Sequence, residues 1–201
     1  MRYTAIAVFF MNQFITYIKP FFNDNPQSLD TLLEHTVVHT YRRDIVYCRE
    51  DEERPYWCYV IDGLVGAYQL DAKKPYLHWV AGDGHYFTGT KHEYSFNSQS
   101  LRISFLKKSK LASIPLPIIQ ILQDQDPTIR RFVSILRQRK STFFDLKALV
   151  IAYDPTMRYA KLCEHLPHIT DQLNNIQLSA FLAIDRKTLY ESKREVLFGR
   201  P

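Results

Sequence analysis

The sequence predicts an α+β protein with an N-terminal antiparallel β-roll or jelly-roll barrel, a long helix and a C-terminal helix-turn-helix domain. Short β-rich runs broken by turns occupy residues 37–114. Apolar residues then recur at alternating three- and four-residue steps from 129 to 153. Two short helices joined by a tight turn follow, and the second is basic. We therefore expect domains at 1–125, 126–153 and 154–201.

The composition is that of a globular protein of one or two domains. The chain has 201 residues, of which 46% are hydrophobic and 23% charged. Six glycines beside thirteen Tyr and thirteen Phe argue against a glycine-rich nucleotide-binding enzyme. Three scattered cysteines without a CxxC pair predict free thiols, with no zinc site and no iron–sulfur cluster. No run approaches the roughly 20 apolar residues of a membrane span, so we expect a cytoplasmic protein. We also expect no cofactor.

Positive charge is concentrated in the last third of the chain. Residues 1–125 contain 13 Lys and Arg against 13 Asp and Glu. Residues 126–201 contain 13 against 8 and so carry the entire net charge of +5. This asymmetry predicts a C-terminal part that faces a polyanion.

The N-terminal part begins with two predicted helices, at 8–19 and 28–35, with Ser28 as the N-cap of the second. The strands are predicted at Val37–Tyr41, Ile45–Cys48, Tyr56–Ile61, Val65–Leu70, Tyr76–Val80, Tyr86–Thr88, Leu101–Leu106 and Leu111–Ile114. Asp62-Gly63 and Gly82-Asp83-Gly84 supply turn chemistry between strands. Many short strands at this spacing favour an antiparallel barrel or jelly roll.

The long helix is predicted from an N-cap and a proline. Pro115 or Pro117 opens a short helix that ends near Gln123. Asp126 then caps a helix whose first residue is Pro127, and Pro155 ends it at about Tyr153. Its apolar stripe has the spacing of a two-stranded coiled coil with one polar position, and we expect it to form a homodimer seam. The seam residues are Ile129, Phe132, Leu136, Arg139, Phe143, Leu146 and Val150, followed by Tyr153. The alternative is a helix buried on its own domain.

The order of a barrel, a long dimer helix and a helix-turn-helix resembles the Crp/Fnr family of transcription regulators. Gly63 resembles the turn glycine of the family's cyclic-nucleotide-binding barrel, and Gly82-Asp83 resembles the Gly-Asp of its ligand cassette. The stretch Leu178-Ser179-Ala180-Phe181-Leu182-Ala183-Ile184-Asp185-Arg186-Lys187-Thr188-Leu189 resembles its helix-turn-helix signature. The resemblance covers about residues 20–198. It implies a homodimer that binds double-stranded DNA and is not an enzyme.

The ligand cassette departs from the family pattern. Thr88-Gly89 falls where cyclic-AMP binders have Gly-Glu, and Gln99-Ser100-Leu101 falls where they have Arg-Ser-Ala. Arg102 is near, but three residues along a strand places it on the opposite face. We therefore expect weak or absent cyclic-nucleotide binding, with Thr88, Gly89, Gln99, Ser100 and Arg102 as the candidate pocket. The barrel either holds another small-molecule effector or is a scaffold.

The predicted recognition helix spans 186–196, with Asp185 as N-cap, and follows helices at 156–166 and 175–182. Arg186, Lys187 and Tyr190 are expected to reach base edges, with Glu191 as an acceptor from cytosine. Thr188, Lys193 and Arg194 are expected at phosphates, while Leu189 packs inward. Three departures from the family pattern are Ala183 in place of the turn glycine, exchanged charges at Lys187 and Glu191, and a chain end before the wing hairpin. The alternative is a solvated charged face.

A second class of function is a cupin-like jelly-roll protein that binds a small molecule or a metal and carries a helical tail. His78, His85 and His92, followed by Glu93, recur in the barrel region. Jelly-roll metal sites favour a tight His-x-His pair, which the sequence lacks, so we expect no metal. Gly-x-Ser-x-Gly, Walker and His-Glu-x-x-His motifs are also missing from the sequence.

Overall fold

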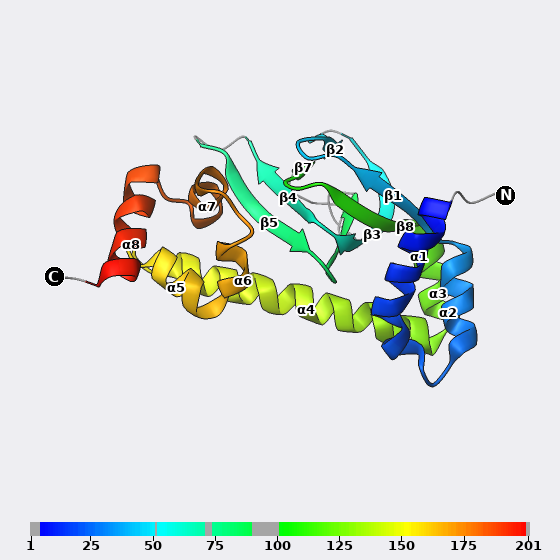
Figure 1. The fold of residues 1–201 in the computed structure, drawn as a ribbon. Helices are drawn as coiled ribbons and strands as arrows, with labels where there is room; N and C mark the ends of the chain where they lie inside the picture. Colours follow the sequence, from blue (N-terminus) through cyan, green and yellow to red (C-terminus); the bar gives the residue numbers. More distant parts are fainter. Residues whose placement is uncertain (1–4, 51, 71–73, 90–100, 200–201) are drawn as a thin grey trace. The chain divides into compact units, whose positions relative to one another are not determined.

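The computed structural model describes residues 5–50, 52–70, 74–89 and 101–199 of the chain (Figure 1). The N-terminal helical elements are α1 (Ala5–Ile18), the 3-10 helix η1 (Lys19–Phe22) and α2 (Pro26–Glu34). The strands are β1 (Val37–Tyr41), β2 (Val46–Cys48), β3 (Arg54–Asp62), β4 (Leu64–Gln69), β5 (Tyr76–Gly82), β6 (Tyr86–Gly89), β7 (Arg102–Phe105) and β8 (Ser109–Pro115). The later helices are α3 (Leu116–Gln125), α4 (Pro127–Ala152), α5 (Arg158–His165), α6 (Pro167–Thr170), α7 (Asn175–Leu182) and α8 (Arg186–Phe198).

The chain divides into two compact units. The first contains Met1–Gly66 and Val80–Lys140, and the second contains Ala67–Trp79 and Ser141–Pro201. The domain boundaries predicted at 125 and 153 lie where the type of secondary structure changes. The boundaries between the two compact units instead fall within β4, β5 and α4. A hairpin segment of the barrel therefore belongs to the same compact unit as the C-terminal helices.

The strands form two four-stranded sheets, ordered β1-β8-β3-β6 and β2-β7-β4-β5. The pairs β1–β8, β2–β7, β3–β6 and β3–β8 are antiparallel. All eight strands overlap the predicted runs, and β1 has the predicted bounds. The β-roll prediction is therefore confirmed, because β-rich runs and the turn residues between them mark the strands locally. Burial alternates strictly in β7, whereas β3, β4, β6 and β8 have consecutive buried residues.

Gly63 lies in the turn between β3 and β4, where only a residue without a side chain fits. Its φ is +116°, and an added Cβ would collide with the Ser109 side chain and the Lys108 carbonyl. The Asp83 carboxylate accepts a 2.8 Å hydrogen bond from the Gly63 amide. The two turn motifs identified in the sequence thus contact each other.

The core of the first unit lies between the sheet that contains β3 and the helices α1 to α4 that pack against it. Trp57 is fully buried and stacks on Tyr86 at 5.6 Å between ring centroids. Phe132 of α4 meets the Trp57 ring edge-on at 6.1 Å, and Phe14 of α1 contacts Tyr59 at 5.3 Å. Aromatic packing therefore fixes the start of α4 against the sheet.

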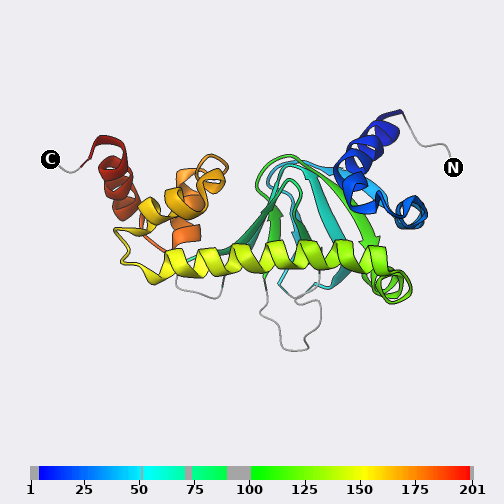
Figure 2. The ribbon, with the colours of Figure 1, turned by 90° about the horizontal axis from the view of Figure 1, so that it is seen from below.

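Helix α4 begins as predicted. The Asp126 carboxylate accepts hydrogen bonds from the amides of Thr128 at 2.8 Å and Ile129 at 3.2 Å. Figure 2 shows α4 as one uninterrupted helix. The Ser28 cap is a wrong prediction, because Asn25 precedes α2 and Pro26 opens it. Because Pro26 is well suited to the first helical position, the helix starts two residues earlier than predicted.

The predicted dimer stripe of α4 is largely buried in its own chain. Ile129, Phe132 and Val150 are 0% exposed, Leu136 2% and Phe143 7%. Ile129, Phe132 and Leu136 belong to the core of the first unit. Arg139 is exposed and Leu146 half-buried. The apolar period thus marks a core-facing stripe, as in the alternative considered above, and those five side chains have no surface left to give a partner helix.

Candidate nucleic-acid interface

Helices α7 and α8 form a helix-turn-helix whose two N-termini are both capped. Asn174 and Gln177 make a reciprocal capping box, with hydrogen bonds of 2.9 and 3.0 Å. The Asp185 carboxylate accepts a 2.8 Å hydrogen bond from the Thr188 amide, which confirms the predicted cap of α8. The bounds of α7 are those predicted, and α8 continues two residues further. The Asn174-x-x-Gln177 spacing is a capping-box signal that can be read from the sequence.

Ala183 has the left-handed conformation that the turn requires, with φ +52° and ψ +44°. Its amide and that of Ile184 both bond the Ser179 carbonyl, which closes the end of α7. An alanine in this region is strained by about 1–2 kcal/mol. The turn is therefore held against local preference by the packing around it.

We expect Ala183→Gly to stabilise the protein by about 0.5–1 kcal/mol, because it removes the strain while adding freedom to the unfolded chain. Urea unfolding followed by circular dichroism measures the change. The matched control, Ala180→Gly within α7, should destabilise by about 1 kcal/mol. Destabilisation by both glycines would contradict the strain argument.

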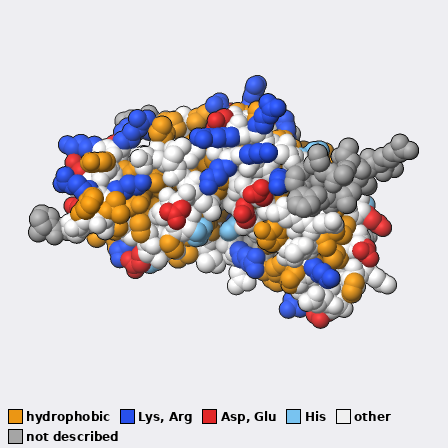
Figure 3. Space-filling view, viewed as in Figure 1, with side chains coloured by type: hydrophobic (Ala, Val, Ile, Leu, Met, Phe, Trp, Pro, Cys, Tyr) orange, Lys and Arg blue, Asp and Glu red, His pale blue; other side chains and the backbone are white. Residues whose placement is uncertain are grey.

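Helix α8 separates an inward face from an exposed one. Leu189 is 2% exposed and Ser192 3%, and the Ser192 hydroxyl donates to the Thr156 carbonyl. The exposed residues among the predicted contacts are Arg186, Lys187, Tyr190, Glu191 and Arg194. Thr188 and Lys193 are half-buried. Figure 3 shows several Lys and Arg side chains on the surface where Figure 1 draws α8.

Two of the basic side chains on α8 have partners within the module. The Lys187 ammonium lies 3.9 Å from the Glu191 carboxylate, in an exposed pair that leaves both side chains accessible. Lys193 donates a 2.7 Å hydrogen bond to Asn175 and lies 5.1 Å from the centre of the Tyr159 ring. Lys193 therefore helps to hold α7, α8 and α5 together, a role that helix spacing alone does not reveal.

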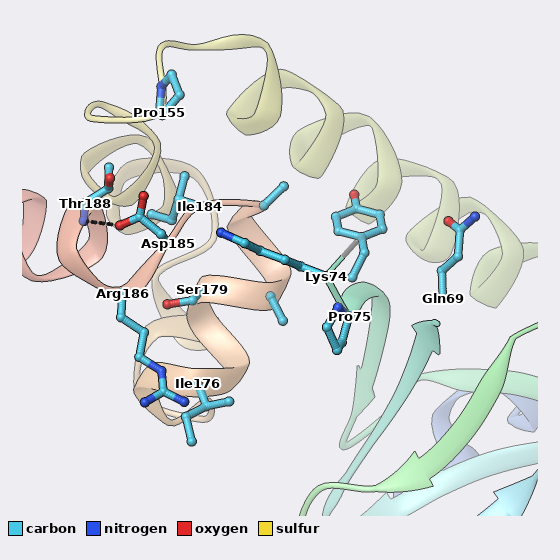
Figure 4. Close-up of a pocket in the computed structure, with 13 residues that line it drawn as sticks. Gln69, Lys74, Pro75, Pro155, Ile176, Ser179, Ile184, Asp185, Arg186 and Thr188 are labelled. Carbon is cyan, nitrogen blue, oxygen red and sulfur yellow. Dashed lines mark hydrogen bonds between the residues drawn. The ribbon is translucent and has the colours of Figure 1, made fainter. Parts of the chain in front are cut away.

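A pocket of about 930 Å³ lies beside the turn. Its walls come from the β4–β5 hairpin, helix α7 and the start of α8, and Lys74 extends from the hairpin toward Asp185 (Figure 4). The hydrogen bond from the Thr188 amide, followed by other polar contacts and the Lys74 charge, lowers the pKa of Asp185. The N-cap is therefore held in its charged, hydrogen-bond-accepting form.

Solved structures share the overall fold. A regulator of the crp/fnr family from Eubacterium rectale aligns with a TM-score of 0.67 over 87% of this chain and 85% of its own, at 12% identity. FixK2 from Bradyrhizobium japonicum aligns at 0.67 over 80% and 84%, with 15% identity. The chain has the Crp/Fnr fold. The c-di-GMP-responsive regulator CLP of Xanthomonas campestris aligns at 0.67 over 86% and 91%, also at 15% identity. No protein-family model and no curated protein matches the sequence.

Within this Crp/Fnr fold, the predicted ligand-pocket residues that the structure describes have structural partners. Thr88 is 6% exposed and pairs with Trp57 across β6 and β3. A Cβ on Gly89 would collide with Arg54, so β6 can approach β3 at this point only with a glycine there. Arg102 forms a 3.1 Å ion pair with Glu50. Gln99 and Ser100 lie outside the described residues.

Aromatic rings also fill the barrel interior of the Crp/Fnr fold. Tyr47 meets Phe87 edge-on at 5.5 Å and Phe105 at 5.8 Å, and Tyr41 stacks on Phe105 at 4.4 Å. The Tyr47 hydroxyl lies 3.2 Å from the Cys58 sulfur, and burial raises the pKa of Cys58 to about 11. All three cysteines are free thiols, as predicted.

His78, His85 and His92 are the histidines of the alternative metal-site hypothesis. His78 lies on β5 and His85 in the turn before β6, while His92 and Glu93 lie outside the described residues. Within the described ranges, no three His, Cys, Asp or Glu side chains come together as a metal ion requires. No helix in the same ranges is both long and apolar enough to cross a membrane.

Proposed function

We propose that this protein is a homodimeric DNA-binding transcription regulator. The observation that carries the proposal is the doubly capped helix-turn-helix, whose second helix presents Arg186, Lys187 and Arg194 to solvent. The shared fold supports it, because structures with this fold include a crp/fnr-family regulator and the global regulator CLP. The protein acts by binding rather than by catalysis.

The start of α8 enters the major groove. Arg186 and Lys187 present donors to guanine edges, Tyr190 offers an aromatic ring that is 69% exposed, and Glu191 accepts from cytosine. Thr188 and Arg194 bond phosphates, and Lys193 contributes mainly through Asn175. Because the Lys187 and Glu191 charges are exchanged relative to the family pattern, the base sequence that is read differs as well.

The dimer forms through a stripe of α4 about 80° from the buried one. At 100° per residue, Ile135, Arg139, Thr142, Leu146 and Leu149 fall within a band about 80° wide, and Tyr153 follows directly after the helix. Leu149 is 42% exposed and Tyr153 38%, while Ile135 and Leu146 are half-buried. These residues keep the alternating three- and four-residue spacing of a coiled-coil seam and have surface to bury. We call this set the outer seam.

The barrel does not bind cyclic nucleotides in the usual way. A nucleotide needs a carboxylate for its ribose and a cation for its phosphate. At the corresponding positions Thr88 is buried and Gly89 packs against Arg54. We expect isothermal titration with cyclic AMP and cyclic GMP to give no saturable binding at micromolar ligand. Micromolar affinity with one ligand per protomer would refute this.

A gel-shift assay tests the proposed function. The probe is the duplex upstream of the protein's own gene, with an unrelated duplex of equal length as the control. Binding should weaken about 10³-fold between roughly 50 and 200 mM salt if six phosphates are contacted. Failure to retain either duplex at the lower salt concentration contradicts the proposal.

A further inference from the structure

Lys147 of α4 is a buried lysine in the second unit that the DNA-binding function does not use directly. Its side chain is surrounded by β5 on one side and α7 on the other, and only 3% of the residue is exposed. Its ammonium group donates hydrogen bonds to the Leu77 carbonyl at 2.6 Å and the His78 carbonyl at 2.7 Å. It also lies 4.3 Å from the Tyr76 ring centre and 4.2 Å from that of Phe181.

Among the described residues, no carboxylate forms an ion pair with the Lys147 ammonium. The titratable groups on β5 that flank it are Tyr76 and His78, and Phe181 faces it from α7. On α5, the positive charge of Arg158 opposes the rise that burial causes in the pKa of Tyr76. Its guanidinium donates hydrogen bonds to the carbonyls of Leu182 and Ala183 at the end of α7. In the described part of the chain, burial is the cause that displaces the pKa of Lys147, and it lowers this pKa to about 7.

The two forms of the amine differ in what burial costs. A neutral amine still has two N–H groups for the two carbonyls, so those bonds survive deprotonation. The ammonium gains from the two rings but loses its hydration, and the loss of hydration is the larger effect. Protonation therefore favours any arrangement in which water reaches the nitrogen.

We propose that Lys147 is a pH-sensitive positioning residue: protonation of this one buried amine loosens helix α7 from β5 and α4 and so changes how the helix-turn-helix is presented to DNA. Phe181 is the contact through which the effect reaches the helix-turn-helix, because it is fully buried in α7 and lies against the ammonium. The DNA part of the proposal rests on the proposed function, whereas the loosening of α7 does not.

Hydrogen exchange of the full chain without DNA tests the loosening. Exchange of the α7 amides at pH 6 and pH 8, corrected for intrinsic rates, gives the opening constant of the helix. Linkage between a buried pKa near 7 and an exposed one near 10.5 predicts an opening constant about tenfold larger at pH 6 than at pH 8. In Lys147→Met, which keeps the length but cannot be protonated, the two values should agree within about twofold.

Two outcomes overturn the proposal. Equal opening constants in the natural protein show that the amine is not a sensor, and a tenfold change that persists in Lys147→Met shows that another titratable group causes it. If Lys147→Met does not fold, the carbon-13 shift of the Lys147 ε-carbon in the natural protein decides. Titration near 10.5 rather than near 7 overturns the proposal.

Gel shifts at the same two pH values test the effect on DNA. The natural protein should bind duplex DNA more weakly at pH 6 than at pH 8, by up to about tenfold as the open form becomes predominant, and this difference should be lost in Lys147→Met. An equal change in both proteins overturns the link to DNA. Absence of DNA binding at either pH contradicts the proposed function instead, and leaves the exchange result standing.

Discussion

Replacing Leu146 and Leu149 together by Glu should convert the dimer to a monomer. Both lie on the outer seam, and Leu149 is 42% exposed in the single chain. Each leucine buried against a partner helix contributes about 1.5–3 kcal/mol, and the two changes act in both copies. We expect the dimer dissociation constant to rise about 10³-fold or more, measured by analytical ultracentrifugation. DNA affinity should fall about 10²–10⁴-fold, because a monomer engages one half-site.

The matched control places two glutamates elsewhere on the same helix. Ser141 and Ala148 are exposed and lie more than about 100° from the outer seam, so Ser141→Glu with Ala148→Glu should leave the dimer intact. An unchanged dimer in the Leu146 and Leu149 variant removes the outer seam from the proposal. Glutamates at Phe132 and Leu136 would instead unfold the first unit, since both side chains are in its core.

Arg186→Ala should weaken DNA binding more than any other single change on α8. Arg186 is exposed one residue after the N-cap, where a recognition helix reaches base edges. A bidentate arginine–guanine contact contributes about 1–3 kcal/mol at each half-site. We expect affinity to fall about 10²–10⁴-fold in gel shifts, with unchanged thermal stability because the side chain is exposed.

Two variants separate base reading from general charge. Arg186→Lys keeps the charge but not the planar fork, so it should restore non-specific binding and leave discrimination between duplexes impaired. Arg42→Ala removes an exposed arginine of the barrel segment before β2 and should change affinity less than about threefold. Equal losses in Arg42→Ala and Arg186→Ala would mean that net charge alone governs binding.

Secondary structure was largely predictable from the sequence because its signals are local. Asp126 and Pro127 at the start of α4 and Asp185 at the start of α8 each act through neighbouring backbone groups. The 3-10 helix η1 and the four-residue α6 were missed. Such short helices have no apolar period, and packing rather than propensity stabilises them.

The candidate site was predictable in its location but not in its internal contacts. The exposed positions Arg186, Lys187 and Tyr190 and the inward Leu189 follow from helix spacing. The bond of Lys193 to Asn175 joins residues 18 positions apart, so no local rule indicates it. Lys147 escaped notice for the same reason, because the carbonyls it binds are 69 and 70 residues away.

Local patterns in the sequence predict the order of the strands and of the longer helices, and the N-caps of α4 and α8, since each of these depends on residues within a few positions. Only the tertiary structure decided which face of α4 is core. A 3.5-residue apolar period looks the same whether its partner is another chain or the protein's own sheet. Burial of Phe132 against Trp57 shows that the partner of this stripe is the protein's own sheet.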